Sequence, residues 1–185
     1  MLETGQPLHI YDYDQLPSRE IVVRKVLKGE NMTNLKGQTM KLSDGDLVLS
    51  AGEEIINLAG IIGSKTTAVS SKTTNILIES AFFAPAFIKK TRQRLNFSTP
   101  ASQYFSKSYN LPWGNYALPR VVELIKEFCP PAGESKILGW AKEPTPEKKT
   151  ILLSHEFIEK KLGVKLSSEK VEEVLQKMRF SFEKR

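Results

Sequence analysis

Two side chains in this sequence, His9 and Glu79, stand out for the acid–base and hydrogen-bonding chemistry that they could perform. His9 follows a Gln-Pro pair, and its imidazole can donate or accept a proton near neutral pH. Glu79 ends an apolar run, and its carboxylate is a strong hydrogen-bond acceptor. Each has an ordinary alternative, a histidine held in a turn and an exposed glutamate at the end of a strand. With one cysteine and two histidines, a zinc site of the Cys/His type is not expected, and we assign no metal ligands.

A basic cluster is the second chemical feature, formed by Lys89, Lys90, Arg92 and Arg94. The whole chain carries a formal net charge of +6, with a pI near 9.3. A basic surplus suits a polyanionic partner, because lysine and arginine release the counterions of phosphates when they bind. A solvated face of a helix explains the same cluster, so both interpretations stay open at this point.

Residues 20 to 80 predict a β-rich segment that would carry Glu79 at its end. The runs with strand-like composition are 21–23, 39–42, 47–49, 55–62 and 75–79. The Asp44-Gly45-Asp46 turn predicts a hairpin between the second and third runs. Ala51-Gly52-Glu53 predicts a turn into the fourth. Short strands with regular turns favour a compact sheet or a small barrel.

Helices are predicted after residue 84. Pro85 suits a first helical position, and the residues that follow share one apolar face: Phe87, Ile88, Thr91 and Leu95. A second helix is predicted over about 115–128, before Cys129-Pro130-Pro131. Its stripe is formed by Leu118, Val121, Val122 and Ile125. The predicted fold class is α+β, with a barrel-like or sheet core and flanking helices.

The sequence predicts two modules, 1–130 and 151–185, joined by a linker at 131–150 that is rich in proline and charge. The second reads as the start of a small helical module of winged-helix type. It would have a strand at 151–153, a helix from Ser154 to Gly163, a helix capped by Ser167 or Ser168, and a strand beginning at 180–182. Val171, Val174, Leu175 and Met178 have the spacing of a buried stripe. So short a module holds little core alone, and we expect it to be completed elsewhere.

Bulk composition predicts a cytoplasmic protein that does not enter a membrane. The longest nearly uncharged apolar run, 55–62, is far shorter than the roughly 20 residues that span a bilayer. No basic segment followed by an apolar core opens the sequence, so we expect no secretory signal. The single cysteine, Cys129, fits a reducing compartment.

A series of short strings follows in order along the first module. They are Glu3-Thr4-Gly5-Gln6-Pro7-Leu8-His9-Ile10-Tyr11-Asp12, Val23-Arg24-Lys25 with Lys28-Gly29-Glu30, Leu35-Lys36-Gly37, Asp46-Leu47-Val48-Leu49, Leu58-Ala59-Gly60-Ile61-Ile62-Gly63, Thr74-Asn75-Ile76-Leu77-Ile78-Glu79-Ser80-Ala81-Phe82-Phe83, and Arg92-Gln93-Arg94-Leu95 with Ser98-Thr99-Pro100-Ala101-Ser102. Their order and intervals resemble the editing module in the beta subunit of bacterial-type phenylalanyl-tRNA synthetases. The tail from Ile151 resembles the small module that follows it there.

The resemblance implies a part of an α2β2 class II synthetase that joins phenylalanine to tRNA(Phe) with ATP and magnesium. The alpha subunit would carry the aminoacylation site and would be a partner of this chain, together with tRNA(Phe). No cofactor is expected in the segment seen here. The editing module of the family hydrolyses tyrosine wrongly attached to tRNA(Phe), so the resemblance implies an aminoacyl-ester hydrolase.

The resemblance also assigns roles to individual residues. Glu79 matches the glutamate that contacts the phenolic hydroxyl of tyrosine, and His9 matches a pocket histidine that positions a water or touches the ribose. The residues that match the amino-acid pocket are Gly63, Thr99 and Ala101. Their ordinary alternatives are a turn glycine, a helix cap and core packing. The basic cluster would meet the tRNA backbone.

Three positions depart from the family pattern: Ser64, Pro100 and Ser106. They leave two main hypotheses, an active editing hydrolase and a non-catalytic scaffold that keeps the architecture and the tRNA-binding surface. A free-standing deacylase or basic RNA-binding protein is a third, which the tail from Ile151 argues against.

Overall fold

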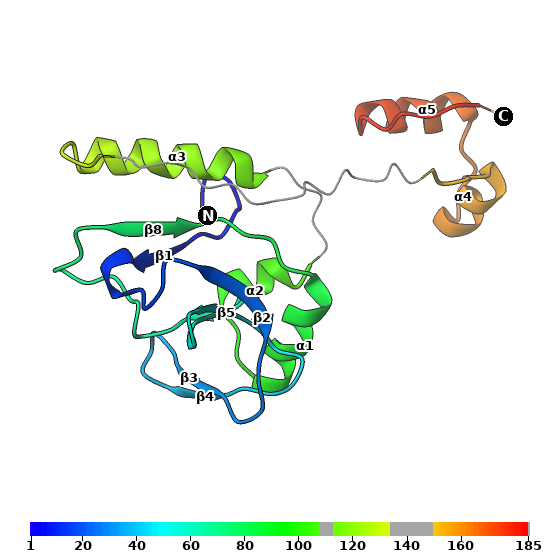
Figure 1. Cartoon of the computed structure of the whole chain (residues 1–185). Helices are drawn as coiled ribbons and strands as arrows, with labels where there is room; N and C mark the ends of the chain where they lie inside the picture. The colour runs from blue at the N-terminus through cyan, green and yellow to red at the C-terminus, as the bar shows by residue number, and fades with distance from the viewer. Residues whose placement is uncertain (108–112, 134–149, 185) are drawn as a thin grey trace. The chain divides into compact units, whose positions relative to one another are not determined.

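The computed structural model describes residues 1–107, 113–133 and 150–184 (Figure 1). The chain divides into two compact units, Met1–Lys142 and Glu143–Arg185, and each is described here by itself. In the described residues, every β-strand and the helices α1 to α3 belong to the first unit, whereas α4 and α5 belong to the second. The α+β class predicted from the sequence is confirmed.

A four-stranded antiparallel sheet forms the centre of the first unit. Its strands, in hydrogen-bonded order, are β2 (Ile21–Lys25), β5 (Leu47–Ala51), β6 (Glu54–Leu58) and β7 (Ile62–Gly63). Successive residues of a strand point to opposite faces, so Val48 and Leu58 enter one apolar cluster while Leu49 and Ile56 enter another. The middle strands are therefore buried on both faces, which explains their nearly continuous apolar sequence.

Two smaller antiparallel sheets complete the β structure. β1 (His9–Asp12) pairs with β8 (Ile76–Glu79), beside which it lies in Figure 1, and β3 (Asn31–Thr33) pairs with β4 (Thr39–Lys41). All three sheets in the described part of the chain are open, so the sheet alternative is the correct one and the barrel-like alternative is not. Neither β1 nor β3 is among the strands that the sequence patterns predict.

The turn predictions have different outcomes. The turn predicted at Ala51-Gly52-Glu53 is confirmed: it joins β5 and β6 as a hairpin, and Gly52 has a φ of +57°. The hairpin predicted at Asp44-Gly45-Asp46 is wrong, because β4 pairs with β3. β5 already has β2 on one edge and β6 on the other, so neither of its edges remains for β4. The apolar run 55–62 is also broken, since Gly60 turns the chain with a φ of +64°.

Three helices follow β8 in the first unit: α1 (Pro85–Leu95), α2 (Pro100–Phe105) and α3 (Trp113–Phe128). Pro85 is the first residue of α1, as predicted, and Ile88 of this helix joins Phe105 of α2 in the apolar cluster that contains Val48. α2 is not among the predicted helices. α3 confirms the second predicted helix and ends directly before Cys129. Its predicted stripe is half-buried.

The second unit contains α4 (His155–Leu162) and α5 (Ser168–Lys177). Ser154 caps α4, Gly163 ends it with a φ of +73°, and Ser167 caps α5, all in agreement with the sequence patterns. The strands predicted at 151–153 and 180–182 are wrong, since neither segment is in a strand. The predicted buried stripe is also wrong, because neither helix buries a residue. Two short helices offer too little surface to cover their own apolar side chains. The linker predicted at 131–150 lies mostly outside the described residues.

No helix in the described segments has both the length and the apolar composition needed to cross a membrane.

Candidate functional site

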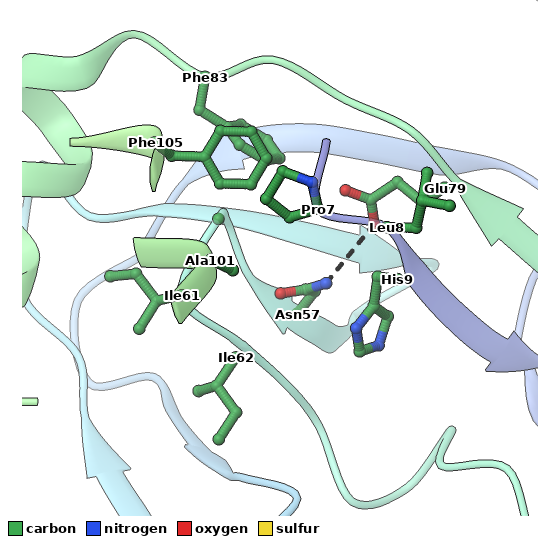
Figure 2. A pocket seen from close by; sticks show the side chains of 11 residues that line it. Pro7, Leu8, His9, Asn57, Ile61, Ile62, Glu79, Phe83, Ala101 and Phe105 are labelled. Carbon is green, nitrogen blue, oxygen red and sulfur yellow. Dashed lines mark hydrogen bonds between the residues drawn. The ribbon is translucent and has the colours of Figure 1, made fainter. Parts of the chain in front are cut away.

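A small open pocket lies where β1, β8, the loop between β6 and β7, and α2 meet (Figure 2). Aliphatic and aromatic side chains form most of its wall, and the polar groups are His9, Asn57 and Glu79. The full lining is Pro7, Leu8, His9, Asn57, Gly60, Ile61, Ile62, Glu79, Phe83, Ala101 and Phe105. An apolar cavity with a few convergent polar groups is typical of a site for a small organic group.

Strand pairing brings the two predicted functional residues together. In the β1–β8 sheet, the Cα of His9 lies directly opposite that of Glu79, although the two residues are far apart in sequence. Both side chains line the pocket, and Figure 2 shows them with Asn57 at the same end of it. His9 and Tyr11 share one face of β1, so their rings meet edge-on with centroids 4.4 Å apart.

Two buried groups hydrogen-bond one oxygen of the Glu79 carboxylate. The Tyr11 hydroxyl donates to Glu79 Oε2, and Asn57 Nδ2 lies 3.5 Å from the same oxygen. Asn57 Nδ2 also donates to the Tyr11 hydroxyl at 2.8 Å. Tyr11 is 0% exposed and Asn57 is 4% exposed. The carboxylate therefore has a fixed partner on one oxygen, whereas Oε1 accepts no hydrogen bond from the described residues.

Burial dominates the acid–base behaviour of this cluster. It raises the pKa of Glu79 above the usual value, and the hydrogen bonds from Tyr11 and Asn57 act in the opposite direction. Burial and the neighbouring Glu79 charge raise the pKa of Tyr11 far above its usual value. The phenol of Tyr11 therefore keeps its proton at neutral pH and serves as a donor.

His9 is a neutral imidazole at pH 7, because burial lowers its pKa from 6.5 to about 4. The backbone of Gly63 lies against its ring. A Cβ at position 63 would overlap both Cε1 and Nε2 of His9, although the φ of Gly63 is not in the left-handed region. Gly63 belongs to β7, so it is not a turn glycine. Glycine is required at position 63 because the imidazole of His9 occupies the space that a side chain would need.

Gly60 performs a related task at the aromatic wall of the pocket. A Cβ on this residue would lie 2.9 Å from Cδ2 of Phe83 and 3.0 Å from Cδ2 of Phe105, and its φ of +64° also favours glycine. The two phenylalanine rings meet edge-on, with centroids 5.2 Å apart. The resemblance assigns Gly63 to the amino-acid pocket and gives Gly60 no role of its own, whereas Gly60 lines the pocket and Gly63 does not.

Thr99 and Ala101 occupy different places. Thr99 caps α2 by accepting a hydrogen bond from Ser102 N at 3.1 Å, and its hydroxyl donates to Ile61 O at 2.8 Å. It therefore ties the start of α2 to the pocket loop but does not line the pocket. Ala101 lines the pocket directly. A substrate contact by Thr99 stays a prediction.

The first 130 residues of the chain match the sequence profile of the B3/4 domain. The chain belongs to the B3/4 domain family. It is also similar to proteins named phenylalanine–tRNA ligase beta subunit. That of Staphylococcus haemolyticus is 36% identical over 187 residues, which cover 97% of this chain and 22% of that protein. That of Dehalococcoides mccartyi strain CBDB1 is 38% identical over 175 residues, covering 95% of this chain and 20% of that protein. The Protochlamydia amoebophila protein is 36% identical over 185 residues, covering 99% and 23%.

The chain thus spans about a fifth of the length of the curated relatives that it matches. The resemblance to phenylalanyl-tRNA synthetase beta subunits, stated from the sequence strings, is confirmed, and the pocket lies within the part of the chain that matches the B3/4 domain.

The basic cluster lies on α1 of the B3/4 domain, but its members differ in their partners. Arg94 forms an ion pair with the buried Asp46 and donates to Lys41 O at 3.2 Å. Its guanidinium therefore serves internal structure, fixing α1 to the segment before β5. Lys89 and Lys90 are exposed.

The three positions that depart from the family pattern take structural roles outside the pocket lining. Pro100 is the first residue of α2, where a proline is well tolerated. The Ser64 hydroxyl lies 3.3 Å from Thr33 O and 3.0 Å from Thr66 Oγ1. The Ser106 hydroxyl donates to Ser102 O at 2.5 Å.

The predictions from sequence omit Tyr11 and Asn57. Tyr11 has a detectable signal, since it alternates with His9 in a short strand-like string. Asn57 has a weaker one, as a polar residue inside the apolar run 55–62. No group of three or more His, Cys, Asp or Glu side chains in the described part of the B3/4 domain is placed to hold a metal ion.

Proposed function

We propose that this chain is part of the beta subunit of a phenylalanine–tRNA ligase, and that its B3/4 domain hydrolyses tyrosine wrongly esterified to tRNA(Phe). The similarity to beta subunits over 95–99% of the chain supports the first part. The proposed partners are an alpha subunit, in an α2β2 assembly, and tRNA(Phe). We assign the class II aminoacylation site, with its ATP and magnesium, to other parts of the ligase.

One observation carries the hydrolytic proposal: an apolar pocket that ends on a half-buried carboxylate, with a neutral imidazole opposite. The aromatic ring of the esterified amino acid would lie against Phe83 and Phe105. Its phenolic hydroxyl would donate to the free oxygen of Glu79 in a charge-assisted hydrogen bond. A phenylalanine ring would leave that oxygen buried without a donor, which disfavours the correct ester.

His9 would orient the attacking water. An imidazole with a pKa of about 4 is a weak base, so it suits the role of a hydrogen-bond acceptor better than that of a strong proton acceptor. The water oxygen forms a bond to the ester carbonyl carbon, and the bond from that carbon to the ribose oxygen breaks. The proton released by the water passes to the ribose oxygen as it leaves.

The test is hydrolysis of tyrosyl-tRNA(Phe) by the assembled ligase that contains this chain, with Glu79→Ala and His9→Ala as variants. We expect Glu79→Ala to lose the preference for tyrosyl over phenylalanyl esters, and His9→Ala to slow the hydrolysis of both. A wild-type rate no faster than spontaneous deacylation would overturn the hydrolytic proposal and leave the scaffold hypothesis. Equal rates in the wild type and both variants would show that the site is elsewhere.

The scaffold hypothesis has its own measurement, co-purification of the beta subunit with the alpha subunit. Wild-type protein and Glu79→Ala should retain the alpha subunit equally, because the pocket lies inside the B3/4 domain. A beta subunit that stays separate from the alpha subunit would argue against the proposed assembly.

A further inference from the structure

The Glu79 carboxylate is held asymmetrically, and the asymmetry points at the pocket. Tyr11 reaches Oε2 from β1, and Asn57 reaches the same oxygen from β6 of the four-stranded sheet. No described residue donates to Oε1, yet this oxygen is not among the fully buried side-chain atoms without a partner in the described residues, which are Gln6 Oε1, Thr67 Oγ1 and Ser80 Oγ. It is therefore open to the pocket that Glu79 lines. Figure 2 shows the bond from Asn57 ending on one carboxylate oxygen while the other points away from Asn57.

We propose that Tyr11 and Asn57 are positioning residues, which hold Glu79 with Oε1 turned into the pocket and thereby set the preference for a hydroxyl-bearing ring. This inference rests on the proposed function of the pocket. Neither residue would touch the ester. Each would act through the carboxylate that does.

The hydrogen bonds on Oε2 affect the charge of Glu79. A carboxylate in an apolar pocket is driven toward its neutral form, because burial penalises the charge. A neutral carboxyl group can donate as well as accept, so it distinguishes a phenol from a bare ring less sharply. An ionised carboxylate only accepts, so Oε1 is satisfied by a ligand that brings a donor. The two hydrogen bonds on Oε2 stabilise this ionised form.

The groups around the carboxylate make these donors decisive. β1 presents His9 and Tyr11, of which His9 is neutral at pH 7 and Tyr11 keeps its proton. β6 presents the uncharged amide of Asn57. In the described residues no lysine or arginine forms an ion pair with Glu79. The hydrogen bonds from Tyr11 and Asn57 therefore take the place of a neighbouring cation in stabilising the ionised Glu79 carboxylate.

The same hydrogen bonds also fix the direction of the Glu79 carboxylate. Glu79 lies on β8, whereas its two donors lie on different strands belonging to different sheets. Donors fixed on two sheets restrict rotation of the carboxylate more than either would alone. The Tyr11 ring itself is anchored in the apolar cluster with Leu49 and Ile56, so its hydroxyl has little freedom to move away.

The decisive variant is Tyr11→Phe, which keeps the buried ring and removes only the hydroxyl. Its matched control is Tyr13→Phe. Tyr13 lies two residues further along, is 36% exposed, and stacks under Arg19, away from Glu79. In the assembled ligase, we expect Tyr11→Phe to lower kcat/KM for tyrosyl-tRNA(Phe) about tenfold, because a hydrogen bond to a charged group is lost. The value for phenylalanyl-tRNA(Phe) should not fall, and Tyr13→Phe should match the wild type.

A readout independent of activity follows the carboxylate itself. The pKa of Glu79 can be measured by carbon NMR of labelled glutamate side chains, with the signal assigned by Glu79→Gln. Removing the Tyr11 hydroxyl should raise the pKa of Glu79. As the pH falls, the preference for tyrosine should therefore be lost at a higher pH than in the wild type. Asn57→Leu supplies the second variant if Tyr11→Phe does not fold, and it should change both readouts in the same direction.

These outcomes separate the inference from the proposed function. Wild-type selectivity together with an unchanged Glu79 pKa in Tyr11→Phe would overturn the inference and leave the hydrolytic proposal intact. If the wild-type ligase hydrolyses neither ester, the proposed function fails, and the inference that it sets a preference fails with it. The NMR titration then still reports whether Tyr11 holds the carboxylate: a raised pKa supports that contact, and an unchanged one refutes it.

Discussion

The contact between Gly63 and His9 gives the sharpest prediction, that Gly63→Ala displaces the imidazole. A methyl group on residue 63 would overlap the His9 ring, and this is the closest approach among the described glycines. Forcing a group into a packed site costs about 1–3 kcal/mol. Alanine also reduces the conformational entropy of the unfolded chain, which offsets about 0.4–1 kcal/mol of this cost because the φ of Gly63 is accessible to alanine. We expect a net loss of about 1–2 kcal/mol in the free energy of unfolding.

The assay is urea denaturation of four proteins: the wild type, Gly63→Ala, His9→Ala and the double variant. If the cost comes from the imidazole, removing the ring should abolish it, so the cycle should give a coupling of about 1–2 kcal/mol between the two sites. Gly133→Ala is the matched control, because its Cβ would meet nothing within 4 Å and its φ is ordinary. The reasoning is refuted if Gly63→Ala is as stable as Gly133→Ala, or if the coupling is absent. If the proposed function holds, the displaced imidazole should also lower the rate of ester hydrolysis in the assembled ligase by about a hundredfold.

Three further predictions concern pH, structure and charge. The pKa of His9 is about 4 in the folded protein and 6.5 in the unfolded chain, so as the pH falls the unfolded chain binds the proton first. The free energy of unfolding of the wild type should therefore fall by up to about 3 kcal/mol between pH 6.5 and pH 4. This fall is measured by urea titration relative to His9→Gln. Asp46→Ala should cost about 2–3 kcal/mol in thermal or urea unfolding, more than the roughly 1 kcal/mol for Arg94→Ala, because Asp46 is buried and Arg94 is partly hydrated. Replacing Lys89 and Lys90 by glutamine should make the negative slope of log K against log salt for tRNA binding shallower by about 2, whereas Arg94→Gln should leave it unchanged. Equal effects would contradict the assignment of Arg94 to internal structure and of the two lysines to tRNA.

Local sequence signals predicted the ends of helices well. Pro85 starts α1, Ser154 and Ser167 cap α4 and α5, and Gly163 ends α4. Such signals work because a cap is satisfied within one helical turn, so no distant part of the chain can change it. The same reasoning explains the correct turn at Gly52, whose φ of +57° is a local requirement.

Pairing between distant strands was not predictable in the same way. Asp44-Gly45-Asp46 has the composition of a hairpin turn, but β5 takes β2 and β6 as neighbours. The register that sets His9 opposite Glu79 depends on a pairing across most of the first unit. The buried stripe predicted on α5 failed for a related reason, because periodicity indicates an apolar face but not what covers it.

The candidate site shows the same division. His9 and Glu79 are chemically conspicuous, and a family resemblance identified both. Tyr11 leaves a signal in the sequence and Asn57 a weaker one, but their role became visible only through packing, because a tyrosine or an asparagine in an apolar strand carries no chemistry until its partner is known. Their hydrogen bonds to Glu79 exist because β1, β6 and β8 meet at the pocket.

The structure also changes where the choice between hydrolase and scaffold should be tested. Ser64, Pro100 and Ser106 suggested a weakened site, yet each is accommodated by a local hydrogen bond or a helix start, and none lines the pocket. What the pocket can bind depends instead on one oxygen of Glu79, to which none of the residues that the structure describes donates a hydrogen bond. If the ligand fills that place with a phenolic hydroxyl, the site selects tyrosine. Whether the Glu79 carboxylate is ionised and accepts a hydrogen bond from the ligand therefore distinguishes the hydrolase hypothesis from the scaffold hypothesis.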